Sequence, residues 1–108
     1  MTKHDVDGLV RLDLNNVVFQ EHLLTLQKVE RHSVLETLNK IRQMTWNQVY
    51  RDHGLKWEKI TSVTLPTGID AIYSLRISQA KRAIAYREGL FMRFLTIAVD
   101  HDATYGKK

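Results

Sequence analysis

The chain has 108 residues, of which 44% are hydrophobic, so it can form one domain with an ordinary core but is too short for two. It has no cysteine, which excludes disulfides and thiolate zinc sites and fits a reducing compartment. The formal net charge is +4; residues 1–54 carry seven basic and seven acidic side chains, whereas residues 55–108 carry nine and five. Basic clusters attract phosphate backbones, but a basic face can also serve solubility alone, and charge does not decide between the two.

The N-terminal quarter of the chain predicts a short strand followed by a helix. Residues 1–8 are polar, which predicts a flexible end, and they lack the apolar segment of a signal peptide. Apolar and charged residues alternate over residues 9–14, as in a strand, and Asn15 and Asn16 can cap a helix that begins near Val17. No apolar run is long enough to span a membrane, so we expect a cytoplasmic protein.

Two capping signals predict further helices. Ser33 and Glu36 have the spacing of a capping box, so we expect a break over residues 30–32, a second helix from Ser33, and an antiparallel helical hairpin. Thr45 and Gln48 repeat the signal and predict a short helix over residues 45–53. Gly54 would end that helix in the left-handed conformation.

Beyond Gly54 the apolar period changes from helical to two, which predicts strands. We expect strands over residues 55–65, interrupted near 59–60, then 71–78, 82–87 and 91–99, with turns at 66–68 and 88–89. In the second of these strands Ser74, Arg76 and Ser78 would point away from the core. The predicted fold is α+β: an N-terminal strand and a helical hairpin packed on one face of a mostly antiparallel sheet of about four strands.

One stretch of the basic half resembles a known family. The sequence Arg76-Ile77-Ser78-Gln79-Ala80-Lys81-Arg82-Ala83-Ile84 is similar to a stretch of the RelE/ParE superfamily, the toxins of bacterial type II toxin–antitoxin systems. In that family one strand bears an arginine and its hairpin partner opens with a second. A final apolar strand, here residues 94–99, leads to a terminal His or Arg and a Tyr, the places of His101 and Tyr105. The resemblance covers most of the chain and implies a single RelE-like domain.

The resemblance implies a ribosome-dependent mRNA endoribonuclease that needs neither a metal nor a cofactor. The 2′-hydroxyl of the RNA would attack the adjacent phosphate and leave a 2′,3′-cyclic phosphate. Such chemistry needs cations, an acid and a base. The candidate catalytic residues are Arg76, Arg82, His101 and Tyr105; the candidate substrate-binding residues are Lys56, Lys59, Lys81, Arg87 and Arg93. We expect no metal at residues 100–102, because successive strand residues point to opposite sides.

Two other functions remain open on the sequence. A ParE-like toxin would act on gyrase without cleaving RNA, and a regulatory module would bind RNA phosphates without catalysis. Each candidate residue also has an ordinary structural interpretation: Lys56 and Lys59, for example, suit an edge strand that must not pair with another chain. For a toxin, the expected partners are a cognate antitoxin, which would cover the basic face, and mRNA on the ribosome.

Overall fold

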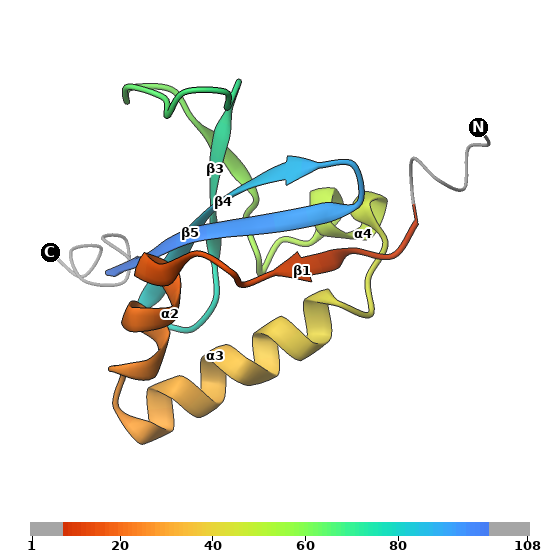
Figure 1. The fold of residues 1–108 in the computed structure, drawn as a ribbon. Helices are drawn as coiled ribbons and strands as arrows, with labels where there is room; N and C mark the ends of the chain where they lie inside the picture. Colours follow the sequence, from red (N-terminus) through yellow and green to blue (C-terminus); the bar gives the residue numbers. More distant parts are fainter. Residues whose placement is uncertain (1–7, 100–108) are drawn as a thin grey trace, which may run out of the picture.

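In a computed structural model, which describes residues 8–99, three helices pack against one mixed sheet of five strands (Figure 1). The elements are β1 (Arg11–Asp13), α2 (Val17–Leu24), α3 (Lys28–Ile41), α4 (Trp46–Arg51), β2 (Glu58–Ile60), β3 (Ile72–Arg76), β4 (Lys81–Glu88) and β5 (Phe91–Val99). The strand order is β1-β5-β4-β3-β2. Strand β1 runs parallel to β5 and all other neighbours are antiparallel, so the predicted α+β class is confirmed, with five strands in place of about four.

The N-terminal helix pair forms as two helices, but the break between them is not where the sequence predicted it. Asn16 caps α2 as expected, because its side chain accepts hydrogen bonds from the amides of Val18 and Phe19. The break falls at residues 25–27, and α3 runs unbroken through Ser33, so the predicted capping box is wrong. The Nη1 atom of Arg31 donates hydrogen bonds to the carbonyl oxygens of Leu24 and Leu26. These carbonyls at and just after the C-terminal end of α2 would otherwise lack a partner within the helix.

The third helix begins as predicted and ends differently. Thr45 and Gln48 form the capping box at the start of α4. The helix ends at Arg51, and Oδ1 of Asp52 then accepts a hydrogen bond from the amide of Leu55 at 2.9 Å. The predicted left-handed Gly54 is wrong, because the residue with positive φ in this turn is Lys56, at 50°. The side-chain bond at Asp52 therefore makes the turn that a glycine was expected to make.

The core lies between the helices and one face of the sheet. The opposite face of the sheet is not part of this core. Buried side chains come from alternate positions of the strands and from the inner sides of the helices; among them are Phe19, Val34, Leu38, Ile41, Trp46, Leu75, Ala83, Ala85, Met92, Phe94 and Ile97. In Figure 1, α2 and α3 lie on one side of the sheet. Residues between these positions, such as Arg76 and Arg82, therefore face away from the helices. We call this side the open face.

The two turns and the last two strands follow the sequence: β5 spans the predicted residues 91–99, and β4 exceeds the predicted 82–87 by one residue at each end. Gly68 and Gly89 have φ of 85° and 62° and lie in the two predicted turns. Strand β2 ends at Ile60, however, so the strand expected over residues 55–65 is mostly wrong, and residues 61–65 are exposed. Ser78 does not point outward either: β3 ends at Arg76, and the Ser78 hydroxyl donates to Glu30 of α3 at 2.9 Å.

Within residues 8–99, none of the helices combines the length and the apolar character needed to cross a membrane.

Candidate nucleic-acid interface

The structure brings two of the predicted site residues together on the open face. Arg76 of β3 and Arg82 of β4 are directly opposed in the antiparallel register. Paired residues of neighbouring strands project from the same side of a sheet, about 5 Å apart. Two arginine side chains therefore leave the sheet from opposed positions, with Ala98 of β5 as the next neighbour of Arg82. A phosphate oxygen accepts charge-assisted hydrogen bonds from guanidinium groups, so two arginines at opposed positions suit a phosphate ligand.

Neutral groups hold Arg82 in place. Its Nη2 atom donates to the carbonyl oxygen of Lys56 at 2.8 Å and to the hydroxyl of Ser74 at 2.9 Å. A guanidinium has five N–H donors, and Nη2 carries two of them. Among the described residues, Nε and Nη1 of Arg82 make no hydrogen bond. The half-buried side chain is thus fixed by one nitrogen, and within residues 8–99 no carboxylate forms an ion pair with it.

The residues around Arg82 come from three segments. Lys56 stands at the left-handed position before β2, and its carbonyl faces Arg82. Glu58 of β2 is opposed to Ser74, so its exposed carboxylate lies on the open face beside the hydroxyl that Arg82 contacts. Lys81 precedes Arg82 in β4 and therefore projects to the other side of the sheet, at its end. The local set on the open face is two arginines, a hydroxyl and a carboxylate.

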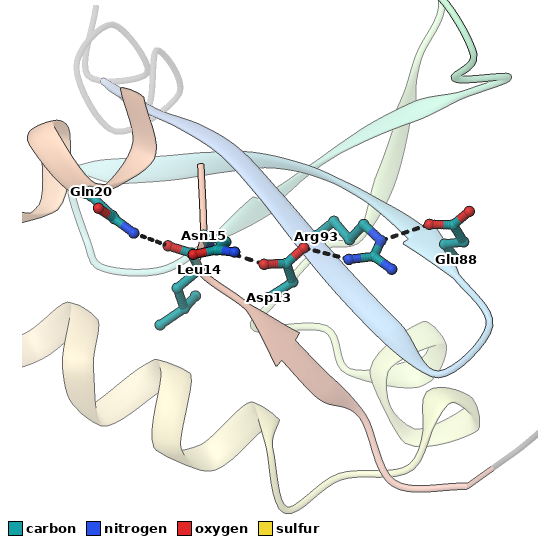
Figure 2. A network of polar contacts seen from close by, with 6 residues as sticks. All are labelled: Asp13, Leu14, Asn15, Gln20, Glu88 and Arg93. Carbon is teal, nitrogen blue, oxygen red and sulfur yellow. Dashed lines mark hydrogen bonds and ion pairs between the residues drawn. The ribbon is translucent and has the colours of Figure 1, made fainter. Parts of the chain in front are cut away.

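Arg93 is also on the open face, but carboxylates surround it (Figure 2). Its Nη1 atom is paired with Asp13 of β1, and its Nε atom with Glu88 at 2.7 Å. These hydrogen bonds raise the pKa of Arg93 above its ordinary value. Partial burial opposes ionisation of Asp13, but the bonds from Arg93 and from the Asn15 amide outweigh it and lower the pKa of Asp13. Arg93 fastens β1 to β5, and its charge is already matched.

Arg87 and Lys59 lie away from the two opposed arginines. The Nη1 atom of Arg87 donates to the Tyr50 hydroxyl and its Nε atom to the carbonyl of Gly89, each at 2.7 Å, while the guanidinium lies 4.5 Å from the centre of the Trp46 ring. Lys59 is opposed to Tyr73 and so projects from the side of the sheet opposite Arg82. The five predicted substrate-binding residues thus do not form one surface.

His101 and Tyr105 lie outside the described residues. Across residues 8–99, no three His, Asp or Glu side chains come close enough to hold a metal ion. Sequence reasoning missed the partners that distinguish the arginines. Ser74 was expected to point away from the core, and a position on that side of the strand beside the next one is the signal that could have suggested its contact with Arg82. The pairing of Asp13 with Arg93, 80 residues apart, had no sequence signal.

In comparisons with known proteins, no family model, no curated protein and no solved structure matches the chain. The function is therefore argued from the residues of this surface.

Proposed function

We propose that the chain is a RelE/ParE-like toxin of a toxin–antitoxin pair and that it cleaves mRNA on the ribosome without a metal. The observation that carries the proposal is the opposed pair of Arg76 and Arg82, with Arg82 fixed by neutral acceptors. The order of elements supports it as well: a strand and helices come first, and an antiparallel hairpin of β3 and β4 that bears both arginines follows. The proposed place of action is the cytoplasm, and the proposed protein partner is a small antitoxin that covers the open face.

The arrangement suits cleavage by the RNA's own 2′-hydroxyl. The 2′-oxygen forms a bond to the adjacent phosphorus, and the bond from phosphorus to the 5′-oxygen breaks. A base takes the 2′-hydroxyl proton and an acid gives one to the leaving 5′-oxygen. Arg76 and Arg82 would stabilise the negative charge that grows on the phosphate oxygens. Glu58 offers a carboxylate base on the same face, and the proposal keeps His101 and Tyr105 as acid–base groups.

Controlled expression without a partner tests the proposal. We expect growth to stop and primer extension on cellular mRNA to show new 5′ ends, because only a nuclease leaves them. Arg82→Ala should restore growth. Normal growth with abundant folded protein would contradict the toxin assignment. Growth arrest without new 5′ ends would contradict the nuclease assignment and favour the gyrase-directed alternative.

A second experiment separates catalysis from RNA binding. We expect Glu58→Gln to lower the rate at which the protein cleaves mRNA in purified ribosome–mRNA complexes about 100-fold, a loss within the range typical of a missing general base. Its affinity for RNA should stay within about twofold. Glu21→Gln is the matched control, because Glu21 is an exposed carboxylate on α2. Binding with a steep salt dependence but no cleavage by the unchanged protein would favour the non-catalytic RNA-binding module.

A further inference from the structure

A cavity of about 360 Å³ lies at the end of β4, apart from the arginine pair. It exists because β3 pairs with β4 only from Tyr73 to Arg76, so that residues 86–88 of β4 pair with β5 alone. The turn after Pro66 and the helix α4 close the space beside this free strand edge. Its walls include the aromatic residues Tyr50, Trp57, Tyr73 and Tyr86.

The aromatic walls of the cavity are held rigidly. The rings of Trp57 and Tyr73 are stacked, with centres 4.7 Å apart and planes 13° apart. The fully buried Trp46 supports Trp57 edge-on at 5.3 Å and contacts Tyr50 at 5.7 Å. Rings fixed in this way lose little conformational freedom when a further flat ring packs against them. The walls therefore favour a planar ligand.

The charges at the cavity nearly cancel. Arg87 contributes one positive charge, fixed by Tyr50 and Gly89. Asp70 and Glu88 contribute two negative charges, but Glu88 is already paired with Arg93 at 2.7 Å. A free phosphate would meet the two carboxylates, and a cation would meet Arg87. A neutral ring whose edges carry both hydrogen-bond donors and acceptors is free of both penalties.

We infer that this cavity binds a nucleobase. Bases are flat, neutral and rich in edge donors and acceptors, and proteins read unpaired RNA bases by stacking them on aromatic rings and bonding their edges. The volume is at the lower end for ligand sites and admits a single nucleoside. The assignment to RNA rests on the proposed function. Tyr86 is four residues along β4 from Arg82, about 13 Å, which a few nucleotides of single-stranded RNA can bridge.

Titration of the full chain with single nucleosides, which have no phosphate, tests the site by itself. The tryptophan indole N–H signals in NMR spectra report on it, since Trp57 lines the cavity and Trp46 is buried behind it. We expect a saturable shift of the Trp57 signal at millimolar nucleoside. Ala71→Phe should abolish the shift by filling the cavity. If that variant does not fold, Tyr86→Leu should weaken binding at least fivefold.

Two outcomes would overturn the site. One is the absence of any Trp57 shift at 10 mM nucleoside, and the other is an unchanged shift in a folded Ala71→Phe or Tyr86→Leu variant. Glu21→Gln serves as the remote control and should bind nucleosides as the unchanged protein does.

A second titration, with a single-stranded RNA of about six nucleotides, tests the source of the base. We expect the RNA to bind at least tenfold tighter than a nucleoside and to lose that gain in Arg82→Gln, which should keep nucleoside binding. Equal affinity for RNA and nucleoside would overturn the assignment to RNA bases. Failure of the nuclease proposal leaves the nucleoside titration unaffected, so the two failures are distinguishable.

Discussion

Arg82 and Arg93 both lie on the open face, yet they are held in different ways. Arg93 is bound by two carboxylates, Asp13 and Glu88, so its charge is used to fasten β1 against β5 (Figure 2). Arg82 is bound by a carbonyl and a hydroxyl, which orient the guanidinium without cancelling its charge. The first arginine is part of the scaffold, and the second is a positioned cation.

The comparison shows why a count of basic residues overstates a binding surface. A phosphate can displace water from Arg82, but at Arg93 it would have to compete with two carboxylates already in place. Arg87 is likewise engaged, by Tyr50 and the Trp46 ring. Within residues 55–99, Arg82 on the open face is thus held by neutral groups, whereas Arg93 is held by carboxylates.

RNA cleavage should show the largest difference between the two arginines. We expect Arg82→Gln to lower cleavage about 100-fold or more, the loss typical when a group that stabilises transition-state charge is removed. Gln keeps an amide donor for the Lys56 carbonyl, which limits damage to the turn. Arg93→Gln is the matched variant and should cleave within about threefold of the unchanged protein. Comparable losses in both variants would contradict the distinction between scaffold and cation.

The salt dependence of RNA binding should differ next. Each phosphate contact adds roughly one to the slope of log affinity against log salt. We expect Arg76→Gln and Arg82→Gln each to lower that slope by about one and Arg93→Gln to leave it unchanged. Filter binding or fluorescence anisotropy between 50 and 200 mM salt would measure it. A lower slope for Arg93→Gln would mean that Arg93 exchanges its carboxylates for phosphate.

Much of the fold follows from local signals, whereas the difference between the arginines does not. Asn16 and the Thr45–Gln48 box mark helix starts because each satisfies free amides within its own turn. Ser33 failed as such a marker, because α3 already begins at Lys28 and runs through it. Strand alternation placed Ser74 and Arg76 on the side away from the core, whereas Ser78 lies beyond the end of β3.

The partners of the arginines could not be read from the sequence, because they come from distant segments. Arg93 binds Asp13 across 80 residues, and Arg82 binds Lys56 across 26. The second contact also depends on the left-handed backbone of Lys56, a conformation that sequence patterns assign to glycine. Whether a guanidinium is matched by a carboxylate is therefore a property of the tertiary structure.

The stability of the fold should depend on the ion pair of Arg93. We expect Asp13→Asn to lower the free energy of unfolding by about 0.5 to 1 kcal/mol, a value that allows for solvent screening of this partly exposed pair. RNA binding should stay unchanged, because Asp13 touches none of the residues around Arg82. Urea unfolding followed by circular dichroism would measure the change. Unaltered stability would mean that the ion pair does not hold β1 in solution.

The acid dependence of stability is the smallest expected effect. It involves Asp13, which contacts Arg93, and Asp52, which holds the turn next to Arg82. Partial burial opposes ionisation of Asp52, but the Leu55 amide and Lys40 outweigh it and lower the pKa of Asp52, as Arg93 and Asn15 do for Asp13. A carboxyl whose folded pKa is lowered stabilises the fold fully above its unfolded pKa, about 4, and loses this as the pH falls through the folded pKa.

Urea unfolding between pH 6 and 2 should therefore show a loss of stability that begins near pH 4. Asp13→Asn and Asp52→Asn should each flatten it, and the double variant most. Asp52 holds the turn that presents the Lys56 carbonyl to Arg82, so Asp52→Asn should also weaken RNA binding slightly at neutral pH, which Asp13→Asn should not. Equal effects on RNA binding would show that the turn does not position Arg82. A loss of RNA binding in Asp52→Asn alone would show that each arginine depends on a carboxylate. Asp13 contacts Arg93 directly, and Asp52 acts on Arg82 through the turn that contains Lys56.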